Sequence, residues 1–152
     1  WMMDSDGRVV EQANNAKAAT ATQLLGVTLE APAVNQKGIA TEMTPSETNE
    51  LGELIPVTTT GAQRLTAALQ IFKALESNDI VGEAASVDVT STEDIILWYG
   101  TRYQVNLGDT SRLDYKIDCM NDAILQMSDY QSGVLDVSFT IWPNQVGYTP
   151  FA

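Results

Sequence analysis

The spacing of apolar and polar residues predicts two amphipathic helices. In TTTGAQRLTAALQIFKALESND, Thr60 followed by Gln63 is a capping-box signature at the start of an apolar stripe. In SRLDYKIDCMNDAILQMSDYQSG, Ser111 stands at the start of a second stripe, and Gly133 is placed as a C-terminal cap. The stripes consist of Leu65, Ala68, Leu69, Phe72 and Leu75 in the first helix, and of Leu113, Ile117, Met120, Ile124 and Met127 in the second. Both stripes are typical of helices that pack on a sheet.

Strand patterns fill much of the remaining chain. ASVDVTS, IILWYG and YQVNLG are rich in β-forming residues, and the turn-prone Gly100 and Thr101 predict that the last two pair as a meander. LLGVTLE is a further short strand candidate. VLDVSFTI, residues 134–141, alternates cleanly and is expected to bury one face. Residues 41–56 are rich in Pro, Gly, Thr and Glu, and they are interpreted as an acidic surface excursion.

The opening DSDG predicts either a hairpin turn or a metal-binding loop. A calcium loop of the EF-hand type that starts at Asp4 needs oxygen donors at its fifth and twelfth positions and Gly at its sixth. Arg8, Asn15 and Val9 occupy these positions, so the spacing is wrong. A hairpin needs only a turn that allows positive φ between β-forming residues, and Asp-Gly supplies it. We therefore expect a hairpin without a metal.

The order of the elements indicates an α+β fold. Strands and helices intermix without the strict alternation of a doubly wound fold. We expect a single domain over residues 1–152, with a mainly antiparallel sheet and two helices packed on one face.

Composition excludes several classes of function. The net charge is −12, and the eight basic residues are scattered, which is unlike a nucleic-acid-binding surface. The chain has no His, which removes Ser-His-Asp and Cys-His catalysis and the commonest zinc ligand. Cys119 falls in the second helical pattern and is interpreted as a buried, inert thiol. No glycine-rich nucleotide motif occurs, so no cofactor is expected, and the lack of His and of calcium-loop spacing means that no metal is expected either.

Pairs of carboxylates are the remaining candidates for catalysis. Such pairs arise easily in a chain with 20 acidic residues, and Asp118 and Asp122 lie off the apolar stripe, facing water. We therefore interpret the chain as a binding or structural domain rather than an enzyme. A site assembled from Asp and Glu alone is the enzymatic alternative.

Five segments follow one another along the chain: WMMDSDGRVVE, LLGVTLEAP, YQVNLGDTSRLDYKIDCMNDAI, GVLDVSF and VGYTP. Their order resembles the extracytoplasmic β domain of the FtsQ/DivIB family of bacterial cell-division proteins. WMMDSDGRVVE resembles the opening hairpin of that domain, and LLGVTLEAP with Gly38 resembles the short strand that follows it. In YQVNLGDTSRLDYKIDCMNDAI and GVLDVSF, Gly108, Lys116 and Asp136 match the family pattern of strand, helix and strand. The tail VGYTP, Val146 to Pro150, resembles the Val-Gly-aromatic-x-Pro of some members. Residues 41–56 match no family feature.

The resemblance implies a function that composition does not show. Members are scaffolds of the division septum without known catalysis, and they bind FtsB/DivIC-type and FtsL-type partners. A transmembrane helix and a POTRA domain precede the β domain, so the expected location is the extracytoplasmic face of the bacterial membrane. We expect a partner to add a strand along VLDVSFTI and to use the tail after it. The expected contact residues are Ser138, Phe139, Trp142 and Tyr148. Alternation also places Phe139 on the core face, so packing is its alternative role.

The alternative to a scaffold is another secreted or surface binding module. Trp98, Tyr99 and Tyr103 would then form an exposed platform for a cell-wall or carbohydrate ligand. Core or cross-strand packing is the commoner role of aromatic residues in strands.

Overall fold

The computed structural model describes residues 1–18, 21–41, 47–48, 52, 54–55, 60–128, 130–140 and 143–151. The helices are α1 (Asn15–Ala18), α2 (Gly61–Ser77) and α3 (Leu113–Leu125), with a 3-10 turn η1 (Val81–Glu83). The strands are β1 (Met2–Met3), β2 (Val9–Glu11), β3 (Gln23–Leu25), β4 (Glu47–Thr48), β5 (Leu54–Ile55), β6 (Ala84–Asp88), β7 (Ile95–Tyr99), β8 (Tyr103–Gly108), β9 (Gly133–Asp136) and β10 (Gly147–Pro150).

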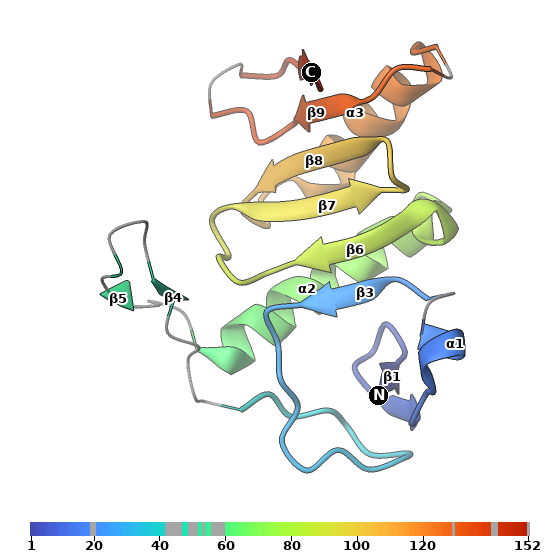
Figure 1. Cartoon of the computed structure of the whole chain (residues 1–152), viewed down its shortest axis with the longest axis vertical. Coiled ribbons are helices and arrows are strands. Elements are labelled where there is room, and N and C mark those ends of the chain that lie inside the picture. Colours follow the sequence, from blue (N-terminus) through green and yellow to red (C-terminus); the bar gives the residue numbers. More distant parts are fainter. Residues whose placement is uncertain are drawn as a thin grey trace.

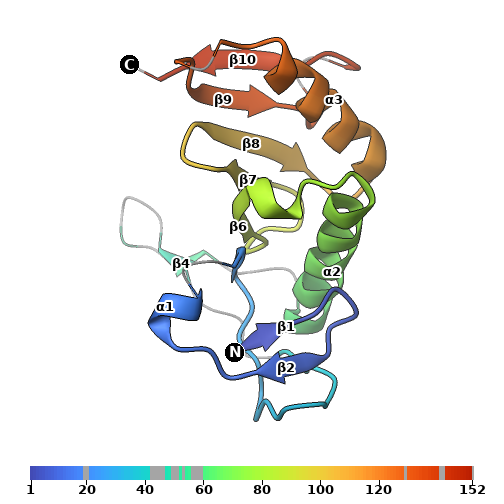
Figure 2. The ribbon, with the colours of Figure 1, turned by 90° about the vertical axis from the view of Figure 1, so that its right-hand side faces the viewer.

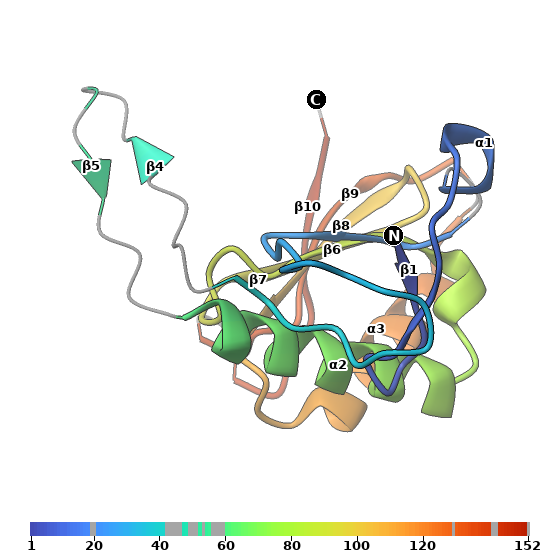
Figure 3. The same cartoon turned by 90° about the horizontal axis from the view of Figure 1, so that it is seen from below.

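A mixed sheet organises the molecule. Its described strands lie in the order β10-β9-β8-β7-β6-β3, as Figures 1 and 2 show from two sides. The contacts β10/β9, β8/β7 and β7/β6 are antiparallel, whereas β9/β8 and β6/β3 are parallel. Helices α2 and α3 cover the same face of the sheet (Figure 3). The predicted α+β architecture and the predicted pairing of IILWYG (β7) with YQVNLG (β8) are therefore confirmed, and β6 pairs with the other side of β7.

Helix α2 begins where the sequence predicts. The hydroxyl of Thr60 accepts a hydrogen bond from the Gln63 amide at 3.1 Å, and the Gln63 side chain accepts one from the Thr60 amide at 2.9 Å. This reciprocal cap satisfies two amides that the first turn leaves without helical partners. The buried face of the helix then packs on the sheet.

Helix α3 is shorter than the sequence predicts. Its N-cap is Arg112, which has a φ of 54°, while Ser111 bonds to Asp109 instead of capping the helix. The helix ends at Leu125, and Gly133 is the first residue of β9. The expected roles of Ser111 as the start and of Gly133 as the cap are therefore wrong. The apolar stripe itself is correct, because its residues pack into or against the core.

The opening segment forms the predicted hairpin. Strands β1 and β2 are antiparallel, and Gly7 adopts a φ of 84° in the turn between them. One carboxylate oxygen of Asp4 accepts hydrogen bonds from the amides of Asp6 and Arg8 at 3.0 and 2.9 Å. The first aspartate of DSDG thus accepts hydrogen bonds from backbone amides of the turn, as is common for Asp in turns.

Strand β9 differs from the predicted strand 134–141. It ends at Asp136, whose carboxylate accepts hydrogen bonds from both the amide and the hydroxyl of Ser138. This turn diverts the backbone, and Phe139 follows with a φ of 61°. Because β8 and β10 flank β9, residues 133–136 have no open edge along which a partner could add a strand, contrary to the docking predicted along VLDVSFTI.

The core lies between the sheet and the two long helices. Its fully buried members include Ile71, Leu75, Val105, Ile117 and Leu135. These residues come from α2, α3 and the central strands, which joins the elements in a single hydrophobic cluster.

Residues 41–56 fall mostly outside the described residues. Within that range, β4 and β5 form a small antiparallel pair. In the described part of the chain, no helix is long and apolar enough to cross a membrane.

Candidate functional site

Strand β10 is one edge of the sheet. Its hydrogen bonds to β9 determine which of its backbone N–H and C=O groups remain available to a partner. The Phe151 amide donates to the Ser132 carbonyl at 3.2 Å, in register with the β9/β10 ladder. Bonded positions alternate in an antiparallel pair, so the backbone groups of Gly147 and Thr149 point toward β9. Those of Tyr148 and Pro150 point away from the sheet. Proline has no amide hydrogen, so Tyr148 presents both a donor and an acceptor, whereas Pro150 presents only a carbonyl.

The side chain of Tyr148 anchors this edge. It packs against the hydrophobic core, and its hydroxyl donates to the Ser132 carbonyl at 2.9 Å. A Cβ at Gly133 would lie 2.9 Å from the Tyr148 ring and 2.8 Å from the Pro150 Cα. Glycine at this position therefore permits the close approach of β10. Tyr148, expected as a free anchor for a partner, is half-buried in its own fold.

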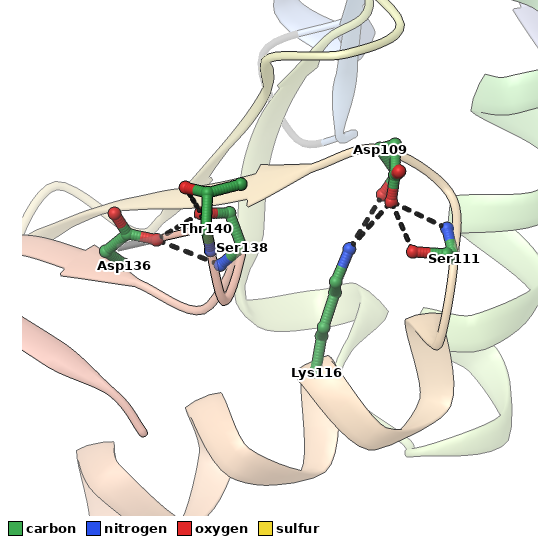
Figure 4. A network of polar contacts seen from close by, with 6 residues as sticks. All are labelled: Asp109, Ser111, Lys116, Asp136, Ser138 and Thr140. Atoms are coloured by element: carbon green, nitrogen blue, oxygen red, sulfur yellow. Dashed lines mark hydrogen bonds and ion pairs between the residues drawn. The ribbon is translucent and has the colours of Figure 1, made fainter. Parts of the chain in front are cut away.

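Ser138 belongs to a turn at the end of β9. Figure 4 shows its hydroxyl between Asp136 and Thr140. The hydroxyl donates to the Asp136 carboxylate at 2.6 Å and lies 2.9 Å from the Thr140 hydroxyl. Because the Ser138 amide also bonds to Asp136, it is not available for strand pairing with a partner.

A second polar group lies beside this turn, at the end of β8. The Lys116 ammonium, with a side chain 2% exposed, donates to the backbone carbonyl and carboxylate of Asp109, both at 3.1 Å. Hydrogen bonds from Ser111, and next from Lys116, lower the pKa of Asp109 to about 2. Gly108 allows the two loops to lie close together, because it adopts a φ of 71° and a Cβ there would lie 2.8 Å from the Ser138 Cβ. The network fixes the backbone on both sides of the β8 and β9 ends (Figure 4).

An aromatic cluster follows from this fixed geometry. The rings of Phe139 and Tyr115 lie 5.6 Å apart, and the Arg112 guanidinium lies 4.5 Å from the Tyr115 ring centre and 5.3 Å from that of Phe139. Phe139 does not belong to the core cluster. The alternative role predicted for it from strand alternation, packing in the core, is therefore wrong. Tyr115 and Arg112 were not expected as site residues, because only the fold brings α3 to the end of β9. Trp142 lies outside the described residues.

Strand β9 connects the edge strand with the aromatic cluster. Gly147, the first residue of β10, pairs with Asp136, the last residue of β9. The cluster starts three residues after Asp136, at Phe139. We call the outward backbone of β10 together with Arg112, Tyr115 and Phe139 the C-terminal edge site. It combines backbone groups for strand pairing with aromatic side chains for anchoring.

The acidic residues and the single cysteine were the remaining candidates for chemistry. Asp118 and Asp122 are exposed on α3, as the sequence predicts. No group of three or more acidic or Cys side chains in the described part of the chain is placed to hold a metal ion. Cys119 is half-buried rather than fully buried.

The aromatic platform of the alternative binding module does not form. Tyr103 is fully buried, and its hydroxyl accepts a hydrogen bond from Arg102 at 2.9 Å. Tyr99 packs against the core with Tyr103, whereas Trp98 stacks on Phe151 at 6.2 Å. Adjacent strand residues point to opposite faces, so Trp98 and Tyr99 cannot bind one ligand together.

Comparison with known proteins gives no match: no family model, curated protein or solved structure is significantly similar to the chain.

Proposed function

We propose that the chain is a non-catalytic scaffold domain that binds an extended segment of a partner protein at the C-terminal edge site. The observation that carries the proposal is the outward-facing backbone of Tyr148 and Pro150 on β10, together with an aromatic cluster that follows the adjacent strand β9. Strand addition to an open edge is a recurrent mode of peptide recognition. Docking was expected along residues 134–141, whereas the open edge is β10. Strand β10 belongs to the tail VGYTP, which was also expected to contact the partner.

The proposed biological setting is that of an FtsQ/DivIB-type β domain. The support is the order of the sequence segments, from the opening hairpin to the C-terminal Val-Gly-aromatic-x-Pro. The proposed partners are segments of the FtsB/DivIC and FtsL types, and the proposed location is the extracytoplasmic face at the division septum. A transmembrane helix and a POTRA-sized domain encoded upstream of Trp1 would agree with this setting. An upstream region encoding neither would contradict it.

The energetics require more than backbone pairing. The N–H and C=O of Tyr148 and the C=O of Pro150 could form hydrogen bonds worth a net ~0.5 to 1.5 kcal/mol each. Association costs about 4 to 15 kcal/mol in lost freedom, so these bonds alone do not hold a partner. Exposed aromatic anchors must supply the rest, and Tyr115 is 42% exposed beside Arg112 and Phe139.

Two substitutions at one position test strand addition. Tyr148→Ala removes the ring and keeps the outward amide hydrogen, whereas Tyr148→Pro removes both. We expect Tyr148→Pro to bind an FtsB/DivIC-type segment about 2- to 10-fold more weakly than Tyr148→Ala, which corresponds to one hydrogen bond. Titration calorimetry measures the affinities, and circular dichroism verifies that both variants are folded. Equal affinities of the two folded variants would exclude pairing along β10.

A matched pair of tyrosines tests the aromatic anchor. Tyr115 belongs to the cluster, whereas Tyr130 is 88% exposed and lies beyond α3. We expect Tyr115→Ala to weaken binding by about tenfold or more, as for an interface anchor. Tyr130→Ala should bind like the parent protein. The aromatic cluster has no role in binding if the two substitutions have the same effect.

A further inference from the structure

A large groove lies at the opposite end of the sheet from β10. It has a volume of about 1410 Å³ and is bounded by the opening hairpin, edge strand β3, α2 and the η1–β6 segment. Figure 1 shows these elements around the N-terminus. Typical small-molecule sites occupy ~300 to 1,000 Å³. This groove is larger, which favours a segment of polypeptide over a metabolite.

Apolar side chains line the groove. Met3 comes from the hairpin, Leu25 from β3, Phe72 from α2 and Trp98 from β7. Leu25 is 46% exposed, and Trp1 at the mouth is 50% exposed. Large side chains left open to water in a concave surface are typical of a contact site for another molecule.

The charged residues of the groove all have one sign. Asp4, Glu76 and Glu83 line it and are exposed, and there is no Lys or Arg among its described lining residues. The whole chain carries a net charge of −12. A ligand with basic side chains is therefore attracted to the rim, whereas an anionic membrane surface is repelled.

The edge of β3 is too short to bind a strand. The Leu25 carbonyl accepts a hydrogen bond from the Val89 amide, and the Gly26 carbonyl accepts one from the Arg64 side chain. The alternation of backbone directions leaves Leu24 as the only β3 residue that faces outward. One residue does not support strand addition, so side-chain contacts must hold the ligand in this groove.

We infer that this groove binds a cationic amphipathic helix of a partner protein. The apolar face of the helix contacts Leu25 and Phe72, and its Lys or Arg side chains face Asp4, Glu76 and Glu83. Helix-in-groove docking of this kind uses apolar residues at spacings of three and four. The site is separate from the C-terminal edge site and does not depend on the function proposed for it.

Three labelled peptides of about 18 residues, enough for a docked helix of several turns, provide the probes. The first has Leu at helical spacing and Lys elsewhere, the second replaces every Lys by Glu, and the third is a scramble of the first. Fluorescence anisotropy with the full chain measures binding. We expect only the first peptide to bind, with an affinity that falls as salt screens the rim charges.

Matched variants locate the binding. Leu25→Gln removes an apolar contact, and Leu125→Gln changes an exposed leucine at the end of α3. Glu83→Lys reverses a rim charge, and Glu93→Lys makes the same charge change in the exposed β6–β7 turn. We expect the two groove variants to lose about 3- to 10-fold in affinity, and both control variants to stay within about twofold of the parent. If Leu25→Gln does not fold, the Glu83/Glu93 pair decides the test.

The remaining outcomes contradict the inference. Equal losses in groove and control variants would show attraction by net charge alone, as would equal binding of the scrambled peptide. Absence of binding by the first peptide would also overturn the inference. Sedimentation velocity and flotation with anionic vesicles test the other occupants. Self-association, or vesicle binding, that Leu25→Gln abolishes would assign the groove to a second copy of the chain or to a membrane instead.

Discussion

The Tyr148 hydroxyl and the Phe151 amide both donate to the carbonyl oxygen of Ser132, at 2.9 and 3.2 Å. A side chain and a backbone group of the C-terminal segment therefore meet at one atom just before β9. This arrangement holds β10 against β9 while the backbone of Tyr148 faces away from the sheet. The edge available to a partner is thus stabilised from within the fold.

Tyr148→Phe should separate the structural role of Tyr148 from its role in binding. The substitution removes one hydrogen bond, and Phe151 still satisfies the Ser132 carbonyl. We expect the free energy of unfolding to fall by about 0.5 to 1 kcal/mol, the low part of the usual range. Urea denaturation measures this change. Partner affinity should be unchanged because the ring and the outward amide remain, and a loss of affinity would place the hydroxyl itself in the interface.

Features that depend on neighbouring residues were predicted well. The cap of α2 needs only Thr60 and Gln63, which are three positions apart. The opening hairpin needs only its Asp-Gly turn, and the β7–β8 meander follows from the short connection between these strands. Such signals operate within a few residues, so the sequence displays them directly.

Features that depend on distant residues were missed. Gly133 looks like a helix cap, but its lack of a side chain serves the approach of Tyr148 and Thr149 in β10. Alternation continues through Ser138 and Phe139, whereas the Asp136 turn ends β9 before them. Strand order in the sheet is likewise non-local, so the sequence did not show that β10 is the edge.

The spacing of apolar residues also did not predict the burial of two cationic side chains. Arg64 in α2 and Lys116 in α3 are 2% and 1% exposed. Arg64 donates to the carbonyl of Gly26, and Lys116 donates to the carbonyl of Asp109. Their apolar stems lie in the interior while the charged ends reach backbone oxygens. Helical spacing alone does not distinguish such residues from solvated ones. The resemblance marked Lys116 as a matching position but not its contacts.

Calcium should not stabilise the protein through the DSDG turn. The carboxylate of Asp4 already accepts two backbone amides, from Asp6 and Arg8. A ligand at a hundred times its dissociation constant would stabilise the fold by about 2.7 kcal/mol. We expect no rise in Tm when calcium is added to chelator-treated protein. Asp4→Ala should lower Tm equally with and without calcium, and a decrease seen only with calcium would indicate a metal site.

Acid should weaken the Asp109 network in a defined pH range. The pKa of Asp109 is about 2 in the folded state, against about 3.9 for an unperturbed Asp. A carboxyl group whose pKa is lowered by folding stabilises the fold at pH values above its pKa in the unfolded chain. This contribution is lost as the pH falls through the pKa of the folded protein. The Asp109 side chain is 59% exposed, so solvent screening keeps the contribution below about 1 kcal/mol.

Asp109→Asn provides the measurement. The variant should be less stable than the parent at pH 7, and the difference should shrink between about pH 4 and pH 2. Asp94→Asn changes an exposed carboxyl group on the β6–β7 turn and serves as the control. Urea midpoints at a series of pH values give the comparison. A parent–variant difference that stays constant down to pH 2 would contradict the proposed role of the carboxylate.

Gly133→Ala should displace the edge strand. A Cβ at this position would lie 2.8 Å from the Pro150 Cα and 2.9 Å from the Tyr148 ring, so β10 must move. We expect a loss of about 1 to 3 kcal/mol in unfolding free energy, as for overpacking elsewhere. Gly82→Ala is the control, because a Cβ there meets nothing within 4 Å. It should be neutral, or stabilising by up to about 1 kcal/mol through the unfolded chain.

The same two glycine variants test whether the position of β10 controls partner binding. If a partner pairs with β10, Gly133→Ala should weaken its binding even at temperatures where the variant is fully folded, because the edge backbone has moved. Gly82→Ala should bind like the parent. Hydrogen exchange reports the displacement directly, through faster exchange of the Thr149 and Phe151 amides that point toward β9. Unchanged exchange together with unchanged affinity in Gly133→Ala would show that the close approach at Gly133 does not control the edge.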